Sequence, residues 1–272
     1  MEKILQYISK ILIQDDSVDS DYGLFYGKMG IAVFLFHYAR FASDQSYREK
    51  AVLMINSCIK EAFLQHHNFN YANGWAGVGT GIEYLVQNDF VNAETNKVLE
   101  KIDKIIFYYT VHGNRSDASL FTGLSGLGRY LLFRIDRQCA NDDHICTLDN
   151  KMLLISITDI FERRYPLFNN VEIVDVLGFL NAMDRTNIFP TKVKRLLPLI
   201  LSDTSFSNQG DMSVRYKKTE ELYCSKYNQL QAEIQKNTPL TVASGLYEGL
   251  AGIGLYLLSK LDKQHNSWMQ LL

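Results

Sequence analysis

Three carboxylates stand where a helical protein could carry out acid–base chemistry. Asp117, Asp175 and Glu248 each lie at or just before a motif that opens into an apolar run. Two carboxylates facing one cavity could act as the acid and the base of a glycosidase, which needs a pair of them across the scissile bond. Asp175 replaces a glycine of its motif, and it could equally be an ordinary N-terminal acid that interacts favourably with the helix dipole.

A second group of side chains at these positions could bind a ligand. It consists of aromatic and polar residues, namely Tyr26, Trp75, Thr122, Arg129 and Tyr247. Trp75 could stack on a ligand in a central cavity or pack between neighbouring helices, and the sequence favours neither. Arg129 lies within an apolar helix, so it must face the cavity or find a partner. A structural Arg129–carboxylate pair is as plausible as a catalytic one.

Cysteine and histidine residues give no recognisable metal site. Cys139, His144 and Cys146 could supply two thiolates and an imidazole, but their C-x4-H-x-C spacing matches no common zinc pattern. We expect them in a polar loop over 138–147, away from the helix starts. Cys58 falls near the apolar stripe of its helix and is expected in the core. The spacing therefore predicts no metal ligands, and the chain also lacks a phosphate-binding loop, a nucleophile elbow and an H-E-x-x-H motif.

A repeated motif positions all of these candidates. G-x-x-G-x-G, followed by an apolar run, begins at residues 74, 123 and 249, with a looser copy at 27 and a decayed copy at 175. The first three steps are each close to the length of a helix pair with its connections. The longer last step predicts an insertion at 205–237, which is charged and resembles a solvated helix or a partly ordered segment.

Between the copies lie amphipathic stretches, such as the one from Tyr47 to Leu64. No stretch shows sustained alternation with period two, which argues against a propeller. We predict an all-α fold forming a single domain over 1–272, an α/α toroid of about five inner and outer helix pairs. Glycines at the start of the inner helices would allow close backbone approach and leave N–H groups free at the mouth of the toroid.

Composition and charge exclude several classes of protein. The chain has 272 residues, of which 47% are hydrophobic, and a formal net charge of −2. These values allow a large core and give no reason to expect nucleic acid or an anionic membrane as the main partner. Lysines interrupt the apolar residues of 1–12, unlike a signal peptide, and the apolar stretch 31–42 is too short to span a bilayer. We expect a soluble, cytoplasmic protein with reduced cysteines and no membrane insertion.

The repeats resemble those of lanthionine synthetase C-like proteins. Gly23 to Ile31, Ser119 to Gly128 and Ser244 to Gly254 carry the resemblance, which extends over roughly 22–262. It implies an α/α toroid of about six or seven helix pairs. In active members, two cysteines and a histidine at inner-helix starts hold a zinc ion. The zinc activates a peptide cysteine thiol, which adds to a dehydrated serine or threonine to form a thioether ring.

The chain departs from this family where the zinc ligands belong. Ala76, in the run from Gly74 to Gly77, stands where active members have a cysteine, and no Cys-His pair occurs anywhere. We therefore expect no cofactor and a divergent, zinc-less member, either a cyclase or a non-catalytic relative, that binds or modifies a peptide in a lanthipeptide-like pathway. Two alternatives stay open. One is an α/α-toroid carbohydrate enzyme that uses cavity carboxylates, and the other is a scaffold whose concave face or 205–237 segment binds a partner protein.

Overall fold

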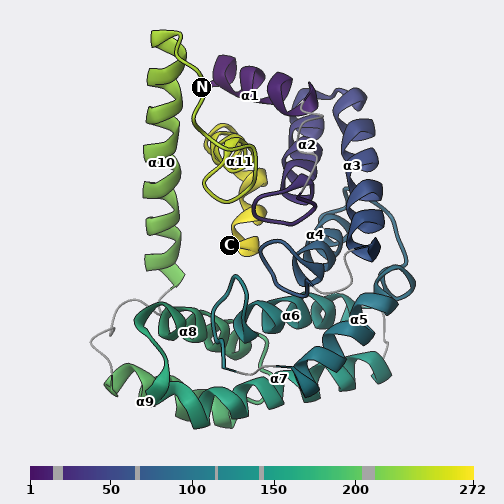
Figure 1. Cartoon of the computed structure of the whole chain (residues 1–272), viewed down its shortest axis with the longest axis vertical. Helices are drawn as coiled ribbons and strands as arrows, with labels where there is room; N and C mark the ends of the chain where they lie inside the picture. Colours follow the sequence, from purple (N-terminus) through teal and green to yellow (C-terminus); the bar gives the residue numbers. More distant parts are fainter. Residues whose placement is uncertain (15–20, 65–67, 114–115, 141–143, 204–211) are drawn as a thin grey trace. The chain divides into compact units, whose positions relative to one another are not determined.

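The structure is a computed structural model that describes residues 1–14, 21–64, 68–113, 116–140, 144–203 and 212–272. All regular secondary structure in these ranges is helical, as the sequence predicts (Figure 1). The helices are α1 (Glu2–Gln14), α2 (Lys28–Ala42), α3 (Gln45–Leu64), α4 (Trp75–Gln87), α5 (Thr95–His112), α6 (Leu124–Ala140), α7 (His144–Arg164), η1 (Tyr165–Leu167), α8 (Asn170–Arg185), α9 (Pro190–Asp203), α10 (Met212–Lys236), α11 (Leu250–Leu261) and η2 (Lys263–Leu271).

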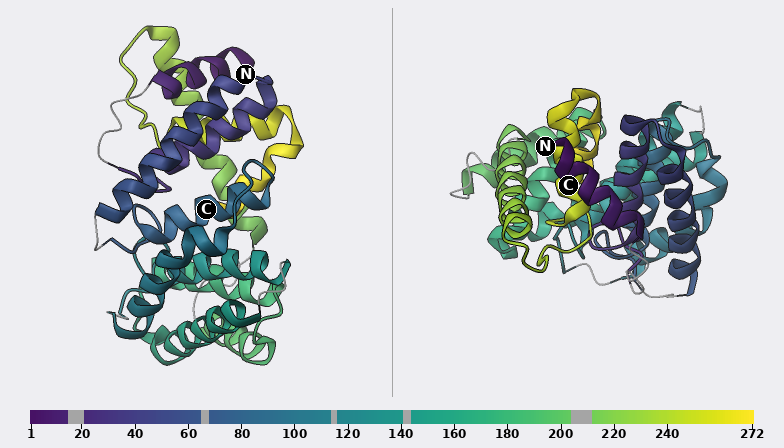
Figure 2. Two further views of the ribbon diagram at one scale, coloured as in Figure 1. Left: turned by 90° about the vertical axis from the view of Figure 1, so that its right-hand side faces the viewer. Right: turned by 90° about the horizontal axis from the view of Figure 1, so that it is seen from above.

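The chain forms two compact units. The first unit combines Met1–Asn68 with Tyr216–Leu272, and the second unit is the continuous segment Phe69–Arg215. In the first unit α2 packs against α1, α3 and α11, and α2 and α3 run side by side in both views of Figure 2. In the second unit α4 packs against α5 and α6, and α6 packs against α7 and α8. The prediction of a single domain stays a prediction.

Helices that are buried on all sides, which we call covered helices, alternate with amphipathic helices, as the sequence predicts. Every residue of α2 from Met29 to Ala39 is buried, and so is every residue of α4 from Trp75 to Val86. The following helix α5 buries a single stripe, made by Thr95, Leu99, Ile102, Ile106 and Thr110. This three-to-four-residue spacing places one face of α5 on the core and the other in solvent. The glycine-led helices are therefore the ones surrounded by protein.

Three of the glycine motifs fold into the same loop. In each, the N–H of the first helical residue donates to the carbonyl oxygen seven residues earlier, which closes the loop against the helix start. The bonds run from Lys28 to Asp21 (3.0 Å), from Leu124 to Asp117 (3.0 Å) and from Leu250 to Ala243 (2.7 Å). A side chain cannot be added at the second glycine, because a Cβ atom on Gly126 would lie 2.2 Å from the carbonyl oxygen of Leu120. The sequence repeat is therefore also a repeat of backbone structure.

The third glycine of a motif receives an aromatic ring from a neighbouring covered helix. A Cβ atom on Gly128 would lie 2.3 Å from the Phe179 ring, so α8 packs into a notch on α6. The same relation joins Gly79 of α4 to Tyr130 of α6 (2.4 Å) and Gly254 of α11 to Phe34 of α2 (2.3 Å). Real Cβ atoms do not approach a neighbour this closely, so the ring occupies space that only glycine leaves free.

Three boundaries differ from the sequence-based expectation. The helix of the decayed copy begins at Asn170, because Asn169 caps it by accepting hydrogen bonds from the N–H groups of Val171 and Glu172. Asp175 therefore lies inside α8 and not at its start. The loop predicted over 138–147 is wrong, because α6 continues to Ala140 and α7 already begins at His144.

The segment 212–236 is a helix that packs through a few buried residues, and most of its described residues are at least partly exposed. Tyr223 and Leu230 of α10 are fully buried, and the Tyr223 hydroxyl donates to the carbonyl oxygen of Leu246 at 2.7 Å. The Tyr223 ring also lies against Gly252 of α11. Thus α10 covers α11 within the first unit. Whether 205–237 is an insertion into a repeat stays a prediction.

The C-terminal helix η2 is held to α2 by two buried histidines. Nδ1 of His37 and Nδ1 of His265 are 2.8 Å apart, so one ring must donate the proton and the other must accept it. Burial lowers the pKa of both rings, and Arg40 lowers them further, while Asp262 partly opposes the decrease at His265. A second proton would place two cations in contact, and folding therefore favours the neutral pair.

We expect the stability of the first unit to decrease at mildly acidic pH. Because the folded-state pKa values lie below the unfolded value of about 6.5, the histidines take up protons on unfolding below that pH. Their contribution is complete above about pH 6.5 and decreases as the pH falls toward the folded-state values. Urea unfolding between pH 8 and pH 5 measures this slope. His265→Gln should flatten it, and the exposed control His112→Gln should not. Equal slopes in all three proteins would contradict the expectation.

We expect Gly128→Ala to destabilise the protein by about 1–3 kcal/mol, because the new methyl group overlaps the Phe179 ring. The loss should be smaller in a Phe179→Leu background, where the flat ring is gone. A double-mutant cycle of the free energy of unfolding measures the coupling between the two sites. Additive effects would mean that the methyl group meets something other than Phe179.

Candidate functional site

Two loops of the first unit bring together an aromatic cluster, which we define as Phe25, Tyr26 and Tyr247. The N–H of Tyr247 donates to the carbonyl oxygen of Phe25 at 2.8 Å, which places the two glycine-led loops edge to edge. The Phe25 and Tyr247 rings stack with centroids 5.4 Å apart, and Tyr26 meets Tyr247 edge-on at 6.1 Å. Sequence analysis placed both tyrosines at helix starts, and the structure adds that they touch.

The aromatic cluster has one buried ring and two rings that are at least partly exposed to solvent. Phe25 is fully buried, Tyr26 is 42% exposed and Tyr247 is half-buried. Burial raises the pKa of the Tyr26 hydroxyl, and Glu248 raises it further, so the phenol stays neutral and can donate a hydrogen bond. The cluster therefore offers ring faces together with a polar group.

Glu248 adds charge beside the aromatic cluster. It adopts a left-handed backbone conformation, with φ of 55°, which is uncommon for a residue other than glycine. Its carboxylate pairs with the ammonium group of Lys226 on α10 at 3.3 Å, and both side chains are partly exposed. Of the three predicted catalytic carboxylates, Glu248 is the one that lies beside the aromatic cluster.

Asp117 and Asp175 lie together in the second unit, where they hold one loop. Asp117 accepts hydrogen bonds from the Thr122 hydroxyl (2.6 Å) and the Ser119 N–H (2.8 Å). Asp175 accepts one from the Leu120 N–H at 2.8 Å. Burial alone would raise the pKa of Asp117, but the hydrogen bonds from Thr122 and Ser119 hold that pKa below its usual value. An Asp117 that stays ionised is suited to bracing the loop and poorly suited to donating a proton.

Two predicted binding residues have different environments. Trp75 is fully buried in α4, so the structure favours packing between helices over contact with a ligand. Arg129 is half-buried in α6. The buried ion pair that the sequence suggested for Arg129 involves a different arginine of the same helix, Arg134.

Sequence analysis missed Arg134, which ties three helices together. The side chains of Arg134 and Glu83 are both fully buried and form an ion pair between α6 and α4. Arg134 also pairs with Asp103 of α5 at 2.7 Å and donates to Asn96 at 3.1 Å. Breaking such a pair leaves a buried charge without compensation, so this network is a structural brace. The sequence signal for a buried ion pair was an arginine within an apolar run. Two arginines of α6 have this property, so the signal could not identify which one forms the pair.

The donors described in the structure do not fit a zinc site. No group of three or more histidine, cysteine, aspartate or glutamate side chains that could hold a metal occurs among the described residues. Ala76 is fully buried in α4, and Cys58 lies in the core as predicted, where burial raises the pKa of its thiol to about 12. The side chains of Cys139, His144 and Cys146 lie outside the described part of the chain. The expectation that the protein binds no zinc therefore stays a prediction.

No helix of the described ranges is long and apolar enough to cross a membrane.

Comparison with known proteins identifies similar chains. Residues 1–120 match the model of a family described as lanthionine synthetase C-like protein. The structure is similar to a solved structure named nisin cyclase, with a TM-score of 0.56 and 14% sequence identity over 100% of this chain and 97% of that chain. No curated protein sequence matches the chain. At this identity the structural likeness shows the fold alone, and it confirms the predicted all-α toroid class.

We expect the protein, purified without an affinity tag, to contain far less than one zinc ion per chain. The reason is that the position of the family's cysteine holds the buried methyl group of Ala76, which cannot bind a metal. Elemental analysis of the purified protein measures the zinc content. Stoichiometric zinc that is lost in a Cys139→Ser, Cys146→Ser variant would contradict the expectation and would locate the metal on that segment.

Proposed function

We propose that this chain is a lanthionine synthetase C-like protein that binds a peptide substrate at the aromatic cluster of the first unit and does so without zinc. The observation that carries the proposal is the contact between Tyr26 and Tyr247 beside Glu248, three residues from two separate glycine-led loops. These loops precede helices α2 and α11, and the family resemblance places functional residues at the starts of inner helices in general.

The chemistry of the aromatic cluster suits a peptide ligand. Ring faces of tyrosine bind apolar side chains and planar peptide groups, and their hydroxyl groups hydrogen-bond to the backbone. The Glu248–Lys226 pair offers one acceptor and one donor of opposite charge within 3.3 Å of each other. Such a surface matches a short peptide segment with an apolar residue next to polar backbone groups.

The same residues favour binding over catalysis. Thioether formation needs a thiolate, and an unperturbed cysteine with a pKa of about 8.5 is mostly protonated at neutral pH. Lys226 beside the cluster would lower the pKa of a peptide thiol, but Glu248 pairs with Lys226 and opposes this effect. We therefore propose a non-catalytic relative that holds a peptide within a lanthipeptide-like modification pathway.

The carbohydrate-enzyme alternative has weaker support. It requires Asp117 and Asp175 to serve as acid and base, yet both carboxylates accept backbone N–H groups of the loop between Asp117 and Thr122. The lowered pKa of Asp117 opposes the role of a general acid near neutral pH. For these reasons we do not propose it as a second function.

We expect Tyr26→Ala and Tyr247→Ala each to weaken peptide binding by up to about tenfold, because each removes an aromatic contact worth about 0.5–1.5 kcal/mol. The probe is a fluorescein-labelled peptide that contains one dehydroalanine and one cysteine, and fluorescence anisotropy measures its Kd. Tyr7→Ala is the matched control, because Tyr7 of α1 is as exposed as Tyr26 (40% against 42%) but lies outside the cluster.

The same mixture tests the non-catalytic part of the proposal. Alkylation of the remaining peptide thiol followed by mass spectrometry should show thiol loss no faster than in buffer. Accelerated thiol loss would overturn that part and leave the binding part standing. Absence of binding, or an equal loss of affinity in Tyr7→Ala, would overturn the assignment of the site.

A further inference from the structure

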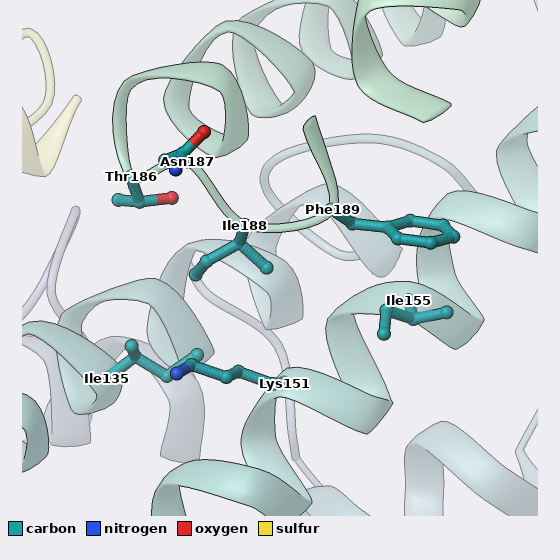
Figure 3. Close-up of a pocket in the computed structure, with 7 residues that line it drawn as sticks. All are labelled: Ile135, Lys151, Ile155, Thr186, Asn187, Ile188 and Phe189. Carbon is teal, nitrogen blue, oxygen red and sulfur yellow. The ribbon is translucent and has the colours of Figure 1, made fainter. Parts of the chain in front are cut away.

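A second concave site lies in the second unit, far along the helices from their glycine-led starts. It has a volume of about 620 Å³ and opens between Ile135 near the end of α6, Lys151 and Ile155 of α7, and the turn from Thr186 to Phe189 between α8 and α9 (Figure 3). This volume is typical of sites for small molecules. The pocket shares no residue with the aromatic cluster, so the inference drawn from it is independent of the proposed function.

The pocket is lined by four apolar residues, two polar residues and one cation. Ile135, Ile155, Ile188 and Phe189 supply the apolar surface, while the Lys151 side chain extends from α7 in the direction of Ile135 (Figure 3). Thr186 and Asn187 add polar groups at the rim. The walls therefore suit a molecule with an apolar body.

Lys151 is free to bind an anion. It forms no ion pair with any side chain that the structure describes, and it is only partly exposed. Lys192, on the other side of the turn, is in contrast compensated by Asp159 and Glu162. The one positive charge that lines this apolar pocket is therefore available to a ligand.

The turn that forms one wall has an unusual backbone. Asn187 and Phe189 both adopt left-handed conformations with φ of 53°. Asparagine tolerates this region, but for a bulky aromatic residue it is an outlier, and such outliers cluster at binding sites. The result is that the Phe189 ring stays 37% exposed at the edge of the pocket, with the Lys192 ammonium 5.8 Å from its centroid.

We propose that this pocket binds a small amphipathic carboxylate, with its apolar body among the isoleucines and Phe189 and its carboxylate on Lys151. A single lysine matches a single negative charge, whereas a doubly charged phosphate would keep one charge uncompensated in apolar surroundings.

The first test compares octanoate with 1-octanol, which share an apolar chain and differ in charge. Isothermal titration calorimetry should show octanoate binding at least about tenfold more tightly than octanol. Lys151→Met should abolish this preference, while Lys194→Met, an exposed lysine of α9 outside the pocket, should retain it. Equal affinities for the two ligands, an undiminished preference in Lys151→Met, or no octanoate binding at millimolar concentration would each overturn the proposal.

The second test keeps the proposal falsifiable if Lys151→Met folds poorly. Ile155→Glu places a carboxylate four residues after Lys151 on the same face of α7, where it can pair with the ammonium group. Octanoate binding should decrease at least about tenfold with the melting temperature unchanged. Phe189→Gly should weaken octanoate and octanol alike, because it removes apolar wall and leaves the charge in place. Full octanoate affinity in both folded variants would show that the ligand binds elsewhere.

Discussion

The contact between a glycine and an aromatic ring of the next covered helix is the constraint on which the rest of the structure depends. Helix α6 shows it most clearly, because it inserts Tyr130 at Gly79 of α4 and receives Phe179 of α8 at Gly128. Each such contact fixes both the distance between two helices and the position of one helix along the axis of the other. Helices fixed in this way bring their preceding loops to corresponding positions, so the loops can carry the variable chemistry.

Loops with the same backbone carry different side chains. The residue before the first glycine is Tyr26 in one copy, Thr122 in another and Glu248 in a third. In the first unit this variation yields a partly exposed aromatic cluster with an adjacent ion pair. In the second unit it yields Thr122, whose hydroxyl is bound by Asp117 within its own loop. The repeated scaffold is thus common to both units, whereas the partly exposed aromatic cluster arises in the first.

The sequence revealed the repeat, the alternation of covered and amphipathic helices and the residues at helix starts, because these depend on local patterns. It could not show that Arg134, rather than Arg129, pairs with Glu83, since helix rotation decides which arginine faces α4 and α5. It also placed Asp175 at a helix start, because the glycine pattern obscured the capping residue Asn169. The pocket depends on the left-handed backbone at Phe189, which no residue type announces.

The first unit is assembled from both ends of the chain, and this affects the order of its formation during synthesis. The second unit is continuous, so the ribosome synthesises all of it before the segment from Tyr216 onward. The hydrogen bond from Tyr247 to Phe25 joins residues that are translated more than two hundred positions apart. An incomplete nascent chain can therefore contain the whole second unit and still lack the aromatic cluster. The aromatic cluster can form only after Tyr247 has been translated.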